Sequence, residues 1–155
     1  MQLILLRHAD ANTEAPTDEE RRLSLKGLDQ ARKVAQFCEA KSLKPALVLS
    51  SPVRRAHETA LLVSDHLKTE LVVAPWLACG MEPETALREL AEHRAEESVM
   101  IVGHEPDFSR LIAWLLGMPG NSQLHIRKAS LTLIDVPTLR QAAGRLEFSL
   151  PCRLM

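Results

Sequence analysis

Short apolar runs alternate along this chain with longer stretches in which apolar residues recur every three or four positions. Four of the runs are continuous and too short for helices, which predicts strands buried on both faces of a sheet. These runs cover residues 3–6, 46–49, 71–73 and 99–102. Two later runs, at 131–133 and 146–150, alternate apolar and polar residues. That alternation predicts two further strands, one or both of them at a sheet edge.

Helical periodicity fills the stretches between these runs. The apolar stripes cover residues 28–38, 53–67, 86–91 and 108–115. Pro83 and Pro106 stand where helices begin, and Gly117 lies where a C-terminal cap belongs. Alternating strands and helices predict an α/β fold, a three-layer sandwich with a central, mostly parallel sheet of about six strands flanked by helices. We find no linker or internal repeat, so we expect a single domain over residues 1–155.

Histidines and arginines follow three of the predicted strands. Arg7 and His8 come after the first, Arg54 and Arg55 shortly after the second, and His104 after the run at 99–102. Alone, each would be more typical of a hydrogen-bonding loop or a solvated helix face. Ligands of such sheets bind beyond the carboxyl ends of the strands, where these residues converge. Arginines in a first helical turn also oppose the helix dipole, which favours a bound anion near Arg55.

Composition narrows the classes of ligand. The formal net charge is −1 at pH 7, so we expect no nucleic-acid or membrane partner, and local arginines would have to hold an anionic substrate. No carboxylate cluster suggests a metal, and we expect no cofactor. Cys38, Cys79 and Cys152 are odd in number and far apart, which favours a reducing, cytoplasmic location over a disulfide framework. We expect a monomer or small homo-oligomer.

At these residues the sequence resembles the histidine phosphatase superfamily, which includes the phosphoglycerate mutases and acid phosphatases, and most closely its small SixA-like phosphohistidine phosphatase branch. Four segments carry the resemblance. Arg7-His8-Ala9 is similar to Arg-His-Gly, residues 51–56 to S-P-x-x-R-A, residues 103–106 to G-H-x-P, and residues 18–27 to D-x-x-R-P-L-T-x-x-G. Ala9 replaces the family's glycine, and Arg22 replaces its proline.

The resemblance implies a phosphoglycerate mutase-like fold and assigns roles to matching residues. Arg7, His8, Arg55 and His104 would form the phosphate pocket, with His8 as nucleophile, and Arg21 would bind substrate. No cofactor is implied.

The chemistry of these residues agrees with those roles. Arginines match phosphate oxygens with forked donors. His8 must attack as neutral imidazole, and like-charged arginines would lower its pKa. We expect a backbone carbonyl in the following loop to bind its other ring nitrogen. In its protonated form, His104 could donate a hydrogen bond to the phosphoryl group.

The general acid has several candidates. Glu82 precedes the helix that begins at Pro83, so it could supply the proton or simply cap that helix. Asp18 and Glu105 are weaker candidates. The remaining histidines lie outside the motifs, and we interpret them as surface or structural residues: His57, His66, His93 and His125.

The sequence therefore predicts a metal-independent phosphatase with a phosphohistidine enzyme intermediate, whose substrate is phosphohistidine on a signalling or phosphotransfer protein. The alternative is a phosphatase of small phosphomonoesters such as sugar phosphates or nucleotides. A mutase is disfavoured because the chain lacks room for the insertions of larger relatives. A non-catalytic module that binds phosphoproteins is disfavoured because none of the four pocket positions is lost.

Overall fold

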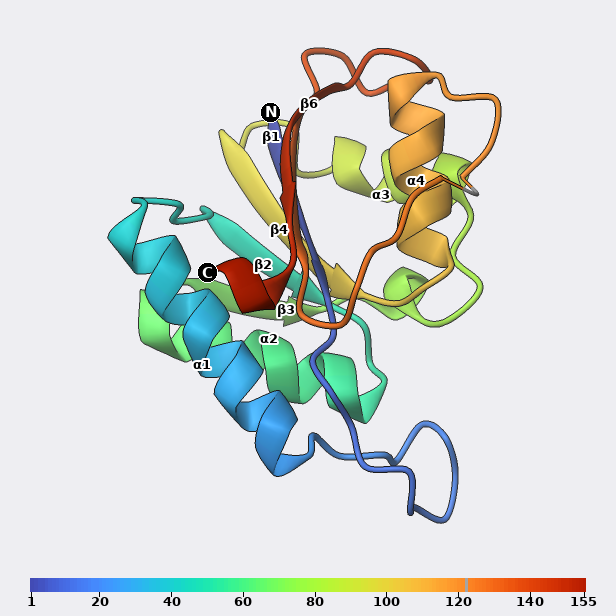
Figure 1. Ribbon diagram of the computed structural model, residues 1–155. Coiled ribbons are helices and arrows are strands. Elements are labelled where there is room, and N and C mark those ends of the chain that lie inside the picture. The colour runs from blue at the N-terminus through green and yellow to red at the C-terminus, as the bar shows by residue number, and fades with distance from the viewer. Residues whose placement is uncertain (122) are drawn as a thin grey trace.

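The computed structural model describes residues 1–121 and 123–155 and contains one six-stranded sheet in the order β3-β2-β4-β1-β5-β6 (Figure 1). The strands are β1 (Gln2–Arg7), β2 (Leu47–Ser50), β3 (Glu70–Val73), β4 (Ser98–Gly103), β5 (Leu131–Asp135) and β6 (Arg145–Leu150). β1 to β4 run parallel, whereas β5 lies antiparallel to both β1 and β6. The predicted α/β sandwich with a mostly parallel sheet is confirmed.

Each predicted strand is present, with small shifts at the ends. β2 begins and ends one residue later than its apolar run, because Ser50 continues the pairing with β4. Of the two late strands, only β6 is at an edge, since β5 pairs on both sides. The other edge is β3, whose residues are mostly exposed.

Four α-helices connect and cover the strands. They are α1 (Leu25–Ala40), α2 (Arg54–Leu67), α3 (Pro83–Ala91) and α4 (Asp107–Leu116). Two short 3₁₀ helices are also present, η1 (Pro75–Leu77) between β3 and α3, and η2 (Cys152–Leu154) after β6. Ser24 caps α1 by accepting a hydrogen bond from the Gly27 amide at 3.0 Å. Gly117 ends α4 in the left-handed conformation expected of a C-terminal cap.

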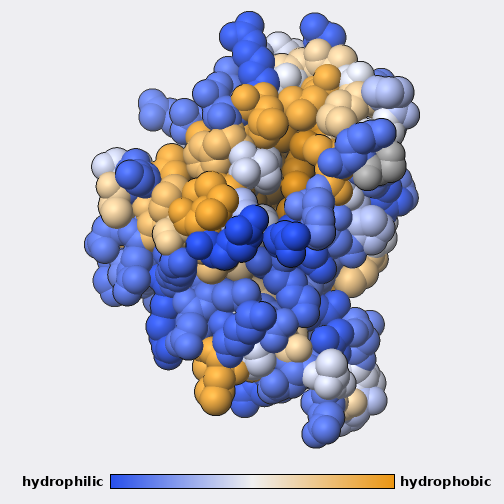
Figure 2. All heavy atoms as spheres, in the orientation of Figure 1, coloured by the Kyte–Doolittle hydropathy of each residue, from blue (hydrophilic) through white to orange (hydrophobic). Residues whose placement is uncertain are grey.

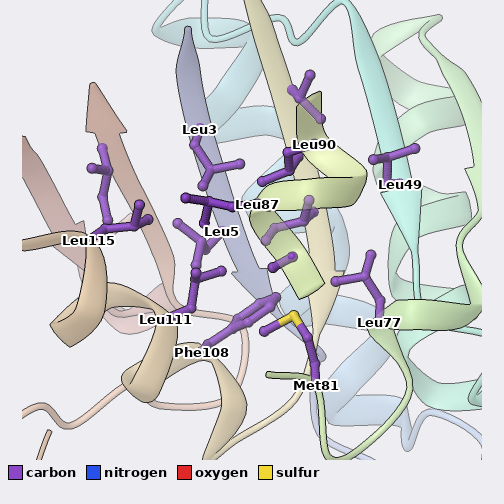
Figure 3. Close-up of a cluster of buried hydrophobic side chains, with 14 of the residues drawn as sticks. Leu3, Leu5, Leu49, Leu77, Met81, Leu87, Leu90, Phe108, Leu111 and Leu115 are labelled. Atoms are coloured by element: carbon purple, nitrogen blue, oxygen red, sulfur yellow. The ribbon is translucent and has the colours of Figure 1, made fainter. Parts of the chain in front are cut away.

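The helices form two layers, and successive strand residues point alternately into them. Leu3 and Leu5 of β1 face α3 and α4, where they pack against Phe108 and Leu111 (Figure 3). Ile4, like its neighbour Leu6, instead joins the cluster beneath α1 and α2. Because both faces of the central strands are covered, their sequences are continuously apolar.

The carboxyl ends of β1, β2 and β4 point toward the lower right of Figure 1. The long connection from β1 to α1 leaves the sheet at this end and projects from the body. Figure 2 shows this projection as mostly hydrophilic, and residues 12–14 and 16–20 within it are exposed. Within the described residues, no helix is long and apolar enough to cross a membrane.

Candidate active site

The residues after β1, β2 and β4 lie side by side because the strands are neighbours and parallel. The His8 amide donates to the Gly103 carbonyl of β4 at 3.0 Å, and the Ser51 amide donates to the Val102 carbonyl at 2.9 Å. The loops that carry His8 and His104, and the segment that leads into the helix of Arg55, are therefore tied to the same end of the sheet. This is the convergence predicted from the sequence.

His8 is held in a single tautomer. Its Nδ1 lies 2.8 Å from the Ala9 carbonyl, and its Nε2 lies 3.2 Å from Arg55 Nε. A guanidinium can only donate and a carbonyl can only accept. Nδ1 therefore carries the proton, and Nε2 presents a lone pair. The sequence analysis expected a backbone carbonyl of the following loop at the other ring nitrogen, and the Ala9 carbonyl lies there.

His8 is also electrically neutral. The pKa of His8 is lowered to about 3, first of all by burial and then by the neighbouring His104, Arg55 and Arg7, against the opposing effect of the Ala9 hydrogen bond. The sequence suggested arginine repulsion as the cause. Repulsion contributes, but removal from water comes first, because the His8 side chain sits deep between the strand ends.

Arg55 is buried in the first turn of α2, and the β1–α1 connection satisfies it. Its Nη1 donates to the Asp18 carbonyl at 2.7 Å, and its Nη2 to Asp18 Oδ2 at 3.0 Å. Arg21 reaches the other carboxylate oxygen, with 2.9 Å from its Nη1 to Asp18 Oδ1, and its Nε donates to the Asn12 carbonyl. Arg21 thus contacts Asp18, which contacts Arg55, and its own contact with substrate stays a prediction.

His104 stands beside His8, with ring centroids 5.3 Å apart and planes tilted by 53°. Its Nε2 lies 2.8 Å from the buried Ser51 hydroxyl. Burial, followed by the charge of Arg55, lowers the pKa of His104 to about 4. At neutral pH His104 is therefore uncharged in the free protein, unlike the protonated donor considered from the sequence, and it has one N–H to offer.

Arg7 is the last residue of β1. Its Nη1 donates to the Ile126 carbonyl at 2.7 Å, and burial lowers its pKa. Arg7 Nε and His104 Nδ1 are buried without a hydrogen-bond partner among the described residues. Polar atoms of this kind are rare in protein interiors and are typical of sites that receive a ligand.

The three acid candidates have different surroundings. The Glu82 carboxylate lies 3.4 Å from Arg110 of α4 rather than over the amides of α3, so its side chain is not a helix cap. The hydrogen bond from Arg21, first of all, lowers the pKa of Asp18, which makes it a poor proton donor. Burial raises the pKa of Glu105, whose Oε1 accepts from the Ser109 amide at 3.0 Å.

Thr59 is a buried residue of the site that the sequence analysis missed. Its hydroxyl accepts from the Ala9 amide at 3.1 Å and donates to the Arg55 carbonyl at 2.7 Å. It therefore joins the loop of the candidate nucleophile to the helix turn that carries the arginine. The signal was present as a polar residue inside an apolar helical stripe, four positions after Arg55.

Asp10 fixes the first part of the β1–α1 connection. Its Oδ1 lies 2.7 Å from Lys128 Nζ, and its Oδ2 accepts from the Ser24 hydroxyl at 2.7 Å. Gly27 packs against the Asp10 carbonyl so closely that an added Cβ would lie 1.9 Å from the oxygen. The glycine of the segment 18–27 is thus required by close approach.

No metal-binding cluster of three or more His, Cys, Asp or Glu side chains occurs among residues 1–121 and 123–155. The positive charge of the site comes from arginines. The arrangement combines a neutral imidazole whose Nε2 lone pair faces Arg55, two guanidinium groups and a second imidazole. Such a set can bind a phosphoryl group and attack it.

Comparisons with known proteins agree with this chemistry. The family described as the histidine phosphatase superfamily (branch 1) matches residues 3–78. The phosphohistidine phosphatase SixA of Escherichia coli (strain K12) is 31% identical over 158 residues, which cover 99% of this chain and 96% of that protein.

Solved structures extend the match over the whole fold. The protein histidine phosphatase SixA complexed with tungstate has a TM-score of 0.86 and 25% identity, with all of both chains covered. The alpha-ribazole phosphatase of Shigella flexneri shares the fold with a TM-score of 0.81 at 20% identity, over 98% of this chain and 97% of that one. The chain belongs to the histidine phosphatase superfamily, in its SixA-type group, and is a phosphatase.

Proposed function

We propose that the chain is a metal-independent phosphatase that forms a phosphohistidine intermediate on His8 and removes phosphate from phosphohistidine on a signalling or phosphotransfer protein. The observation that carries the proposal is the tautomer of His8. The Ala9 carbonyl accepts a hydrogen bond from the protonated Nδ1, and Arg55 Nε donates to Nε2. The nucleophilic lone pair is thereby directed at a phosphate-binding group.

In the first step the phosphoryl group binds between Arg7, Arg55 and His104. Arg55 Nε turns from His8 Nε2 to a phosphoryl oxygen, which releases the lone pair for attack. A bond forms between Nε2 and phosphorus, the bond to the leaving atom breaks, and the leaving atom keeps the electron pair. The guanidinium groups stabilise the charge on the equatorial oxygens as the transition state forms.

In the second step water attacks the phosphohistidine and restores neutral His8. The arginines remain in place and supply the charge that a metal ion supplies in other phosphatases. Arg21 holds Asp18 and through it Arg55, so we assign it to the same pocket. We further propose that residues 1–155 act as one histidine phosphatase domain.

Two features support a phosphohistidine substrate. The curated relative in Escherichia coli is a phosphohistidine phosphatase. Between β2 and β4 the chain forms α2, β3, η1 and α3, whose apolar residues join the two cores. That segment therefore adds no separate cap, and a side chain on a folded protein could reach the pocket.

A phosphatase of small phosphomonoesters is the second candidate. The shared fold with alpha-ribazole phosphatase favours it, because the same scaffold serves a small phosphoester there. The two functions differ in kcat/KM for a phosphohistidine-bearing phosphotransfer protein against sugar phosphates, nucleotides and phosphoserine peptides. A small ester preferred by about tenfold or more, ~1.4 kcal/mol of transition-state binding, would favour this candidate.

The intermediate itself can be trapped. The protein is mixed with phosphohistidine substrate in excess EDTA, quenched, and assayed for phosphate that is labile in acid and stable in base. Wild type should be labelled at His8 and turn over. His8→Ala should show neither label nor turnover, and His93→Ala, which lies outside the pocket, should behave as wild type. Full turnover in His8→Ala, or loss of activity in EDTA that magnesium restores, would contradict the mechanism.

A further inference from the structure

Asp18 lies at the boundary between the buried pocket and solvent. Its side chain is 63% exposed, whereas that of Arg55, to which it is bonded, is 7% exposed. The two carboxylate oxygens are divided between two arginines, Oδ2 to Arg55 and Oδ1 to Arg21. A single guanidinium group therefore separates the Asp18 carboxylate from the attacking Nε2 of His8.

The charge of Asp18 also reaches the other walls of the pocket. Asp18 opposes the fall in the His104 pKa, of which burial is the largest cause. It adds to the rise in the Cys79 pKa, which burial also dominates. The Cys79 sulfur in turn lies 4.0 Å from Arg55 Nη2. A largely exposed carboxylate that acts on Arg55 of α2 and on residues of two loops lies at the mouth of the pocket that they form.

We infer that Asp18 is a specificity-determining residue that favours N-phosphorylated imidazoles over phosphoesters through the charge of the leaving group. The inference rests on the proposed function and deepens it. The Asp18 carboxyl is ionised at neutral pH, since the hydrogen bond from Arg21, first of all, lowers its pKa still further, so a carboxylate charge lies at the mouth of the pocket between two arginines. A departing group that leaves through this mouth passes beside that charge.

The two substrate classes place opposite charges there. When His8 attacks phosphohistidine, the phosphorus–nitrogen bond breaks and its electron pair stays on the leaving ring nitrogen. If the other ring nitrogen carries a proton, the substrate ring is cationic and departs as neutral imidazole, with no proton donor needed. A carboxylate beside the ring stabilises its protonated form.

In a phosphoester the electron pair goes to oxygen, which becomes an alkoxide or phenolate. The negative charge that develops on that oxygen is repelled by Asp18. Relative to the free substrates, the same carboxylate thus stabilises the transition state of the protonated ring, which still carries part of its positive charge, and destabilises that of the ester. If Asp18 served only to hold Arg55 in place, its loss would slow both classes alike.

The test compares Asp18→Asn with wild type on two small substrates, free phosphohistidine and p-nitrophenyl phosphate. Asparagine keeps an oxygen that can accept from Arg55 but has no charge. We expect the ratio of kcat/KM, phosphohistidine over p-nitrophenyl phosphate, to fall by at least about tenfold. The alkaline limb of kcat for phosphohistidine should also move to lower pH, because the bound ring loses the anion that favours its protonation. Glu14→Gln, which removes one charge elsewhere in the same exposed connection, should leave the ratio within about twofold.

Equal losses on both substrates, or an unchanged ratio in Asp18→Asn, would overturn the inference alone. Failure of the wild type to cleave phosphohistidine would overturn the proposed function, and the inference with it. The two failures are separate because the first is measured on the variant and the second on the wild type.

Discussion

Replacing Thr59 by valine should weaken both the fold and the catalysis, because one hydroxyl group joins two parts of the site. Thr59 is fully buried, and valine has nearly the same shape, so no cavity forms. The Ala9 amide loses its acceptor at 3.1 Å. A buried amide without a partner costs about 1–3 kcal/mol. The Arg55 carbonyl loses its bond from Thr59 as well but keeps its place in the hydrogen-bond ladder of α2.

The expected loss corresponds to a fall in Tm of about 2–4 °C per kcal/mol for a chain of this size. The kcat for p-nitrophenyl phosphate should fall by about 10–100-fold, since the freed Ala9 peptide also holds the Nδ1 proton of His8. Thr59→Ser keeps the hydroxyl and should retain most of both. Ser64→Ala removes a buried hydroxyl of the same helix that only donates to the Leu61 carbonyl, and it should leave kcat unchanged. A Thr59→Val protein with wild-type kcat and a Tm within about 1 °C of wild type would refute the positioning role.

Two further predictions concern acid and the proton donor. Burial holds the pKa of His8 at about 3 and that of His104 at about 4, so each takes up a proton on unfolding below its ordinary pKa of about 6.5. The free energy of unfolding should therefore be highest above that pH and fall by about 1.4 kcal/mol per pH unit for each histidine, toward pH 3 for His8 and toward pH 4 for His104. Urea unfolding from pH 4.5 to 7 should show a shallower fall in His8→Gln, and identical slopes would contradict the cause. Glu82→Gln should slow alkyl phosphates more than phosphohistidine, because an alkoxide needs a proton and imidazole does not. Steady-state rates with Glu84→Gln as control test this, and equal losses on both substrates would remove Glu82 from the acid role.

The part of the site that follows strand ends could be predicted from the sequence. Continuous apolar runs identify β1, β2 and β4, and parallel strands bring their carboxyl ends together whatever their order in the sheet. His8, Arg55 and His104 could therefore be placed near one another before their contacts were known. The order of the strands could not be deduced, because no local pattern states which strand pairs with which.

The contacts that tune the pocket could not be predicted, because they come from segments without periodicity. Asp18 reaches Arg55 from an exposed connection 37 positions away, and Ile126 holds Arg7 across 119 positions. Neither segment has a hydrophobic pattern that fixes its path. The main cause of the low His8 pKa could not be predicted for the same reason. That cause is burial, and its depth depends on how the loops close over the strand ends.

The charge balance of the free pocket explains why two histidines can stand beside two arginines. If both imidazoles were protonated, four positive charges would share a buried space, at a cost that burial magnifies. With both neutral, the positive charge comes from Arg7 and Arg55, and it attracts a phosphoryl dianion. In the free protein, Arg55 helps to hold the pKa of His104 at about 4. The dianion has the opposite charge and therefore raises this pKa when it binds. Substrate therefore raises the affinity of His104 for a proton at the moment when a donor to the phosphoryl oxygens is useful. His8 cannot take up a proton in this way in the covalent intermediate, because its Nε2 is then bonded to phosphorus.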